Sequence, residues 1–166
     1  MNYTAIKKYD IANLKGLRTS IWFSGCNGFN GQHCKGCFNQ DLWSFKSGKP
    51  FTDEVKQYVF DTLADEHTKG RLSILGGEPL QQNLDEMLSF VKEVKERFPN
   101  GNIALWTGYY LDELNEKQKE IISYCDFVVD GRFDESKTTL NLKFKGSSNQ
   151  TIWENKNGTF VKSKLN

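Results

Sequence analysis

Three of the four cysteines in the chain lie close together in the stretch SGCNGFNGQHCKGCFN, which covers residues 24–39. Cys26, Cys34 and Cys37 follow the pattern C-x7-C-x2-C. Clustered thiolates bind zinc or an iron–sulfur cluster, and a close pair of cysteines also forms disulfides or acts as a redox dithiol. Each of these chemistries needs a different number and spacing of ligands, so the spacing helps to choose among them.

The spacing fits an iron–sulfur cluster better than the other sites. A structural zinc site is tetrahedral and usually has two close ligand pairs, whereas the first gap here is seven residues long. The fourth zinc ligand would be His33, adjacent to Cys34, or Cys125, which opens an apolar strand and is expected to be a buried free thiol. A dithiol of Cys34 and Cys37 leaves Cys26 unexplained. Three thiolates on a cluster leave one iron open to a small molecule, and zinc remains the main alternative.

A second group of candidate residues follows three later strands. The segment ILGGEP places Gly76, Gly77 and Glu78 at a strand end, where two glycines let a ligand approach bare backbone. A Gly-Gly pair by itself indicates only a tight turn. Thr107 and Asp130 close the next two strands, and Asp130 equally suits a turn cap. Parallel strands would bring all of these residues to the same edge of a sheet as the cysteines.

The elements that must position these residues follow an alternating α/β pattern. Apolar runs and helical spacings predict strands at 19–25, 71–79, 102–108 and 125–131, and helices at 53–67, 84–98 and 111–124. The segment TIWENKNGTFVK predicts a terminal hairpin that turns at Asn157 and Gly158. Four or five strand–helix units are too few for an eight-stranded barrel. We therefore predict a partial, incomplete β/α barrel with mostly parallel strands.

Length and composition indicate one domain without a nucleic-acid or membrane partner. The 166 residues are expected to form a single domain, 1–166, with a more polar tail from about Phe133. A net charge of +1, with 26% charged and 37% hydrophobic residues, argues against nucleic-acid binding. No apolar run reaches the roughly 18 residues of a membrane span, so we expect a cytoplasmic protein. In that reducing compartment, a cysteine cluster is expected to bind metal or act in catalysis.

The cysteine pattern together with GGEP resembles the radical S-adenosylmethionine superfamily. More narrowly, the order of segments is similar to the family of proteins that activate anaerobic ribonucleoside-triphosphate reductase. These segments are DIANLKGLR, SGC with CKGCFN, GGEPL, WTGYY, CDFVVDGRF and FKGSSNQTI. The resemblance spans almost the whole chain. GSSNQ is its most discriminating segment, because general cluster chemistry does not require it.

The resemblance implies one 4Fe-4S cluster and S-adenosylmethionine as cofactors. The reduced cluster would cleave S-adenosylmethionine to methionine and a 5′-deoxyadenosyl radical, which would remove a hydrogen atom from a glycine Cα of the reductase. The implied partners are this glycyl-radical protein and a low-potential electron donor such as flavodoxin. The three clustered cysteines would hold the cluster, with no catalytic residue beyond it. The implied cofactor-binding residues are Gly36, Phe38, Gly76, Gly77, Glu78, Thr107 and Asp130.

Two features depart from the superfamily pattern. The commonest spacing there is C-x3-C-x2-C, so the stretch NGFNGQH makes the first gap four residues longer. The position before the last cysteine is Gly36 instead of an aromatic residue, and the aromatic Phe38 follows that cysteine. Two alternatives stay open, namely an activase of another glycyl-radical enzyme and a small zinc-stabilised binding module.

The sequence also leaves open the roles of two further groups near strand ends. Ser147, Ser148 and Asn149 either cap backbone in a loop or face the mouth of the site. Tyr109 and Tyr110 either guide a glycine loop of a partner or pack after a strand.

Overall fold

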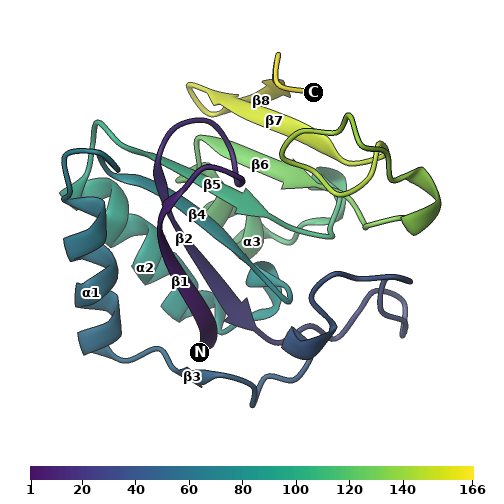
Figure 1. Ribbon diagram of the computed structural model, residues 1–166, viewed down its shortest axis with the longest axis horizontal. Coiled ribbons are helices and arrows are strands. Elements are labelled where there is room, and N and C mark those ends of the chain that lie inside the picture. The colour runs from purple at the N-terminus through teal and green to yellow at the C-terminus, as the bar shows by residue number, and fades with distance from the viewer.

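The computed structural model describes residues 1–166 as one eight-stranded sheet with three α-helices (Figure 1). The strand order is β3-β1-β2-β4-β5-β6-β7-β8. The strands are β1 (Asn2–Asp10), β2 (Arg18–Ser24), β3 (Lys49–Pro50), β4 (Arg71–Gly76), β5 (Asn102–Trp106), β6 (Phe127–Asp130), β7 (Thr151–Lys156) and β8 (Thr159–Lys162). The helices are α1 (Asp53–Leu63), α2 (Leu84–Arg97) and α3 (Glu116–Ser123). No helix is long and apolar enough to cross a membrane.

The expectation of mostly parallel strands is wrong. The central strands β2, β4, β5 and β6 form three parallel pairings, but the flanking strands add four antiparallel ones. A parallel pairing needs a crossover long enough for a helix, whereas an antiparallel neighbour needs only a turn. The three helices provide the three parallel steps. Short connections join β1 to β2 and β7 to β8, whereas β3 and β7 are reached through long loops without an α-helix. The sheet is therefore mixed, and this topology does not confirm the predicted partial barrel.

The strands that the sequence patterns missed lie at one side of the sheet. β1 is mostly exposed or half-buried and carries charged residues among apolar ones, so no continuous apolar run marks it. β3 is only two residues long. The predicted terminal hairpin is confirmed as β7 and β8, which are joined at Asn157 and Gly158. Gly158 has a φ of +90°, as a tight hairpin turn requires.

Side-chain caps determine where the helices begin. Thr52 Oγ1 accepts a hydrogen bond from Val55 N at the start of α1, and Asn83 Oδ1 accepts from two amides at the start of α2. Asn115 and Gln118 form a reciprocal capping box at the start of α3. Because this cap begins a new helix, the predicted helix 111–124 is divided into a short 3-10 turn, Leu111–Glu113, and α3. The first helix ends at Leu63, earlier than predicted.

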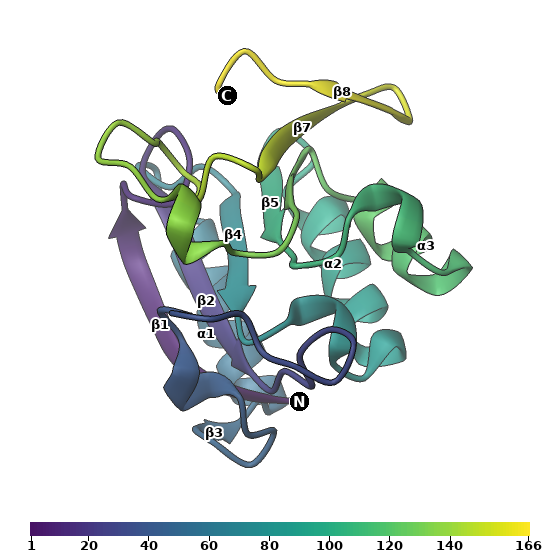
Figure 2. The same cartoon turned by 90° about the vertical axis from the view of Figure 1, so that its right-hand side faces the viewer.

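All three helices cover the same face of the sheet (Figures 1 and 2). Alternate side chains along the central strands pack against these helices and form the main core. The strand members of this core are Ile21, Phe23, Leu72, Ile74, Ile103, Leu105 and Val128. Burial of each such side chain stabilises the fold by about 1.5–3 kcal/mol. This apolar layer fixes the central strands, and therefore the positions of their carboxyl ends.

A buried polar network links three of the central strands. Arg18, the last residue of DIANLKGLR, donates to Ser73 Oγ at 2.7 Å, to Asn102 Oδ1 at 2.7 Å and to the Leu72 carbonyl oxygen at 2.6 Å. Burial lowers the pKa of Arg18 to about 10. The guanidinium group joins β2 to β4 and β5, which gives this segment a structural role.

Two long loops meet at the carboxyl ends of the parallel strands. Residues 25–48, which we call the cysteine loop, follow β2, and residues 131–150 follow β6. Both loops lie at the right-hand side of Figure 1 and face the viewer in Figure 2. β4 and β5 end at the same edge because they run parallel to β2 and β6. Residues far apart in the sequence are thereby collected at one rim of the sheet.

Candidate functional site

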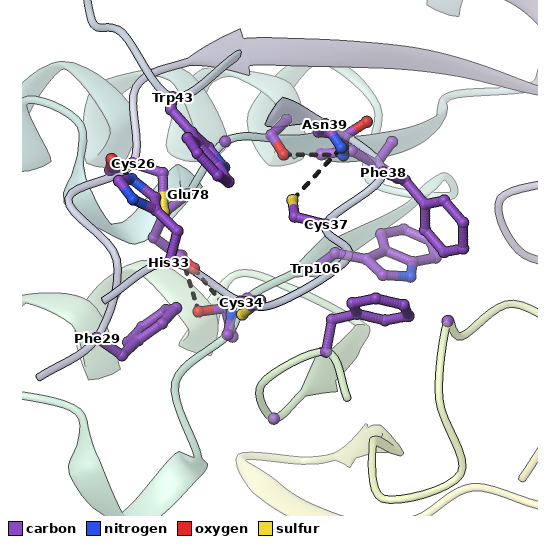
Figure 3. A pocket seen from close by; sticks show the side chains of 18 of the residues that line it. Cys26, Phe29, His33, Cys34, Cys37, Phe38, Asn39, Trp43, Glu78 and Trp106 are labelled. Carbon is purple, nitrogen blue, oxygen red and sulfur yellow. Dashed lines mark hydrogen bonds between the residues drawn. The ribbon is translucent and has the colours of Figure 1, made fainter. Parts of the chain in front are cut away.

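A pocket at this rim is lined by both loops and by the ends of β4 and β5 (Figure 3). Eight of the ten site residues predicted from the sequence line it: Cys26, Cys34, Cys37, Phe38, Gly76, Gly77, Glu78 and Thr107. The other two, Gly36 and Asp130, do not line it. The fold therefore brings the cysteine loop and the GGE segment into one cavity.

The three cysteines in the pocket are free thiols, and each is partly buried. Backbone amides point at two of the sulfurs, since Gly28 N donates to Cys26 Sγ at 3.3 Å and Asn39 N donates to Cys37 Sγ at 3.4 Å. Burial raises the pKa of Cys26 to about 11 and also raises the pKa of Cys34, so metal binding must displace protons. No three His, Cys, Asp or Glu side chains are arranged around a single ion position. Three free thiols, two of which accept hydrogen bonds from backbone amides, are a suitable donor set for an iron–sulfur cluster.

The longer first gap of the cysteine pattern folds as a turn that is bound to the rim. Phe29 and Gln32 pair through two backbone hydrogen bonds of 2.7 and 3.1 Å. The side chain of Gln81 accepts a hydrogen bond from the Asn27 amide at 2.6 Å and donates to the Gly28 carbonyl oxygen at 3.1 Å. The additional residues are therefore ordered by the segment that follows GGEP.

A second set of contacts connects the end of this turn to its beginning. His33 stacks on Trp43 with ring centroids 3.9 Å apart. Its Nε2 lies 2.8 Å from the Cys26 carbonyl oxygen, and the Cys26 amide donates to the Trp43 carbonyl oxygen at 2.9 Å. Together these contacts keep Cys26 and Cys34 on the same pocket despite their wide spacing.

Residues 76 and 77 must be glycines because protein backbone surrounds them closely. A Cβ atom on Gly76 would lie 2.0 Å from the Phe23 carbonyl oxygen, and the φ of Gly76 is +134°. A Cβ atom on Gly77 would lie 2.5 Å from the Gly25 carbonyl oxygen. The missing side chains make room for the start of the cysteine loop, so a substitution at Gly77 would disturb that loop as well as any ligand.

Most polar backbone groups of the GGE segment bind within the protein. Gly77 N donates to the Phe23 carbonyl oxygen at 2.9 Å, and Glu78 N donates to the Gly25 carbonyl oxygen at 2.8 Å. The Gly76 carbonyl oxygen accepts from Asn39 Nδ2 at 3.1 Å. The Gly77 carbonyl oxygen accepts no hydrogen bond from the protein. It is therefore an unpaired backbone acceptor on a residue that lines the pocket.

Glu78 and Thr107 bind each other and form part of the pocket wall. The side chain of Glu78 is buried, and its Oε1 accepts from the Thr107 hydroxyl at 2.8 Å and from Leu80 N at 3.0 Å. Its Oε2 accepts from Gly108 N at 2.8 Å. Burial raises the pKa of Glu78 to about 7 despite these donors. The carboxyl group therefore joins the end of β4 to the end of β5.

Asp130 and Gly36 face other parts of the protein. Asp130 is buried, and its Oδ2 accepts from the Leu111 amide at 3.1 Å, so its carboxylate caps backbone. Burial raises the pKa of Asp130. A Cβ atom on Gly36 would meet the side chain of Glu135 at 2.6 Å. Cys125 is buried and makes no disulfide, which confirms the expectation of a buried free thiol.

Several pocket residues were not identified from the sequence: Phe29, Trp43, Trp106, Gly131, Phe133, Gly146 and Gln150. Some lie within segments that carry the family resemblance, such as Trp106 in WTGYY and Gln150 in GSSNQ. That resemblance was the available signal for them. Phe29 and Trp43 have no such signal, because their positions depend on how the cysteine loop folds.

The rim of parallel strands and its three free cysteines fit the class of iron–sulfur proteins. The family model described as a 4Fe-4S single cluster domain matches residues 12–153, which include the cysteine loop and all four parallel strands. The match supports an iron–sulfur cluster as the group that this domain holds.

Curated relatives identify the family within that class. An anaerobic ribonucleoside-triphosphate reductase-activating protein from Haemophilus influenzae is 38% identical over 154 residues, which cover 92% of this chain and 97% of the relative. Proteins of the same name from Escherichia coli (strain K12) and Enterobacteria phage T4 are 36% and 35% identical, over 92% and 96% of this chain and 97% and 98% of their own lengths. The chain belongs to the family of anaerobic ribonucleoside-triphosphate reductase-activating proteins.

Proposed function

We propose that this chain is a radical S-adenosylmethionine activase that generates the glycyl radical of an anaerobic ribonucleoside-triphosphate reductase. The observation that carries the proposal is that three free cysteines and the unpaired Gly77 carbonyl oxygen share one pocket. A cluster and its S-adenosylmethionine must lie side by side, and this pocket offers ligands for both. The printed names of the relatives and the 4Fe-4S domain match support the same assignment.

In this proposal Cys26, Cys34 and Cys37 hold a 4Fe-4S cluster. Three protein ligands leave one iron free for a small molecule, as the sequence spacing suggested. The bound cluster supplies one electron that splits S-adenosylmethionine into methionine and a 5′-deoxyadenosyl radical, which removes a hydrogen atom from a glycine Cα of the reductase. The amides of Gly28 and Asn39 stabilise negative charge on the ligating sulfurs. The protein thus tunes the cluster, orients S-adenosylmethionine and shields both from water, while the cofactors provide the reactivity.

The GGE segment orients the methionyl end of S-adenosylmethionine. The Gly77 carbonyl oxygen accepts a hydrogen bond from the ammonium group of the cofactor, and such a charge-assisted bond contributes about 1.5–3 kcal/mol. Glu78 and Thr107 act indirectly, because their mutual hydrogen bond keeps the ends of β4 and β5 in register at the pocket wall. Aromatic side chains such as Trp43 and Trp106 line the cavity and exclude water from it.

The reductase closes the open side of the pocket. A single domain of this size has only its polar tail, from about Phe133, left to build a separate substrate pocket, and that tail already contributes Gly146 and Gln150 to the cavity. The glycine-bearing loop of the partner therefore enters at the rim, near Tyr109 and Tyr110. Reacting atoms must approach to roughly 3–3.5 Å for efficient transfer, which an enclosed complex provides.

The proposal also covers the setting of the reaction. A low-potential donor such as flavodoxin reduces the cluster, and the protein works in the cytoplasm, where thiols are kept reduced. In this proposal the mixed sheet serves as an incomplete barrel of the radical S-adenosylmethionine type, and its open side admits the partner.

The test is to mix the reduced, cluster-loaded protein with S-adenosylmethionine and the anaerobic reductase in the absence of oxygen. Electron paramagnetic resonance should show a glycyl radical on the reductase, and the signal should be absent with the Cys34→Ala variant. Cleavage of S-adenosylmethionine without a glycyl radical would assign the activase to another protein substrate. A loaded cluster that never cleaves S-adenosylmethionine would refute the proposed chemistry.

A further inference from the structure

The GSSNQ turn, residues 146–150, is held together by the side chain of Gln150. Gln150 Oε1 accepts hydrogen bonds from Gly146 N at 2.8 Å and from Ser147 N at 3.1 Å. Its Nε2 donates to the Gly131 carbonyl oxygen at 2.9 Å. One amide side chain therefore closes the turn and binds it to the segment that follows β6.

Two more side chains of the GSSNQ turn bind the same segment. Asn149 Nδ2 donates to the Arg132 carbonyl oxygen at 2.8 Å. Ser147, which is fully buried, accepts from the Asp134 amide through its Oγ at 3.1 Å. Together with Gln150, these side chains bind backbone groups on both sides of Phe133. Ser148 lies in the same turn, but its side chain is exposed and makes no hydrogen bond.

The segment that the turn binds carries Phe133 into the pocket. The Phe133 ring packs against Phe38 with centroids 4.9 Å apart, and Phe133 lines the pocket together with Cys34. Gly146 also matters here, because a Cβ atom on it would lie 2.9 Å from the Phe133 ring. The turn, the aromatic ring and the cysteine loop are therefore in one continuous line of contacts.

Arg132, the neighbour of Phe133, is held at the same rim. Its guanidinium carbon lies 4.7 Å from the Phe29 ring centroid and 5.2 Å from the Tyr110 ring centroid. Arg132 also forms an ion pair with Glu113 at 2.8 Å. The Asn149 side chain binds the Arg132 carbonyl oxygen, so the turn holds the backbone that carries the Arg132 and Phe133 side chains.

We propose that Ser147, Asn149 and Gln150 are positioning residues, which hold the backbone of residues 131–134 so that Phe133 forms the pocket wall beside Cys34. The inference rests on the proposed function, since the ligand whose site this wall shapes is S-adenosylmethionine. It explains why the chain carries GSSNQ although cluster chemistry does not require that segment. Of the two readings from the sequence, Ser147 and Asn149 follow the first, because their side chains cap backbone and neither lines the pocket.

Asn149 provides the sharpest test because it does not line the pocket, and its side chain donates to the Arg132 carbonyl oxygen, next to Phe133. Asn149→Ala and Asn149→Asp both remove the amide donor, and Ser148→Ala is the matched control in the same turn. The first measurement is hydrogen exchange on the protein without its cofactors. Amides of residues 131–134 should exchange roughly tenfold faster in both Asn149 variants than in the wild type. Their exchange rates should be unchanged in Ser148→Ala. Unchanged exchange in the Asn149 variants would overturn the proposal that Asn149 holds the backbone of residues 131–134.

The second measurement is the affinity of the anoxic, cluster-loaded protein for S-adenosylmethionine. Asn149→Ala should weaken binding about tenfold with full iron content, and should have less than a twofold effect when Phe133→Ala is already present. If Asn149→Ala weakened S-adenosylmethionine binding equally with and without Phe133→Ala, or in neither case, Asn149 would not act through Phe133. A wild-type protein with an intact cluster that binds no S-adenosylmethionine would instead refute the proposed function. The exchange measurement would still show whether the GSSNQ turn holds residues 131–134.

Discussion

The two sides of the pocket are built in different ways. On the β4 side, the Glu78 carboxyl group is buried and accepts three hydrogen bonds from neighbouring groups of the protein. On the other side, Cys26, Cys34 and Cys37 are only partly buried, and their thiols are free. The Glu78 carboxyl group is therefore satisfied within the protein, and the Gly77 carbonyl oxygen is the acceptor that this side leaves unpaired, whereas the cysteine loop presents three free thiols to a metal. Positioning and metal binding are thus assigned to separate parts of the rim.

The largest effect should come from the cysteine side. Single replacement of Cys26, Cys34 or Cys37 with Ala should abolish iron and sulfide binding, because each removes one of three protein ligands. The apolar core should still fold, so far-ultraviolet circular dichroism of these variants should match that of the cofactor-free wild type. Iron and sulfide analysis after anoxic purification provides the measurement.

The control for the cysteine variants is Cys125→Ser, since Cys125 is buried away from the pocket. This variant should keep its iron. Loss of iron from Cys125→Ser alone, with normal folding, would contradict a cluster held by three cysteines.

On the β4 side of the pocket, Glu78→Gln should mainly lower the free energy of unfolding. The amide nitrogen of Gln replaces one oxygen that accepts from Gly108 N or Thr107, so a buried donor loses its partner. The expected cost is about 1–3 kcal/mol of unfolding free energy, measured by urea denaturation at neutral pH. Iron content should fall less than in the cysteine variants. A variant as stable as the wild type would show that the carboxyl group does not hold β4 to β5.

The raised pKa of Glu78 predicts a pH dependence on this side. The pKa lies near 7 in the folded protein and near 4.5 for an ordinary Glu, so between these values the folded state binds more protons than the unfolded state. The contribution of Glu78 to stability is therefore fully present below about 4.5 and declines as the pH rises through 7. The difference in unfolding free energy between wild type and Glu78→Gln should shrink over this range. A constant difference would indicate that Glu78 does not titrate there.

The smallest effect is expected at His33, which supports the cysteine loop without being a ligand. His33→Ala removes the stacking on Trp43 and the contact with the Cys26 carbonyl oxygen, whereas His33→Phe keeps the stacking. Both variants should retain iron, and the alanine variant should lose about 1 kcal/mol of stability. Loss of iron from both variants would indicate that His33 is itself a ligand of the cluster, and would contradict a purely supporting role in the longer gap.

Much of the central fold could be predicted from the sequence, because its signals are local. Apolar runs marked β2, β4, β5 and β6, and helical spacings of apolar residues marked the helices between them. The antiparallel flanks were not predicted, since β1 has no continuous apolar run and owes its place to pairing with β2. Strand pairing of this kind depends on contacts between distant residues, which a local pattern does not contain.

The membership of the pocket was easier to predict than the direction of its side chains. Parallel strands require that GGE and the cysteine loop meet, and they do. Whether Glu78 faces a ligand or Thr107 depends on how β4 and β5 end beside each other. In the same way, Asp130 turns to the Leu111 amide because the chain returns there after β5. Such orientations are properties of the assembled rim.

The central claim is that the cysteine side and the GGE side act on one S-adenosylmethionine molecule. Electron–nuclear double resonance on the reduced, cluster-loaded protein tests it directly, with S-adenosylmethionine labelled by nitrogen-15 at its amine and by oxygen-17 at its carboxylate. The account predicts coupling of both labels to the cluster, because the iron without a protein ligand binds the methionyl end. An intact cluster that binds S-adenosylmethionine without coupling to either label would contradict it.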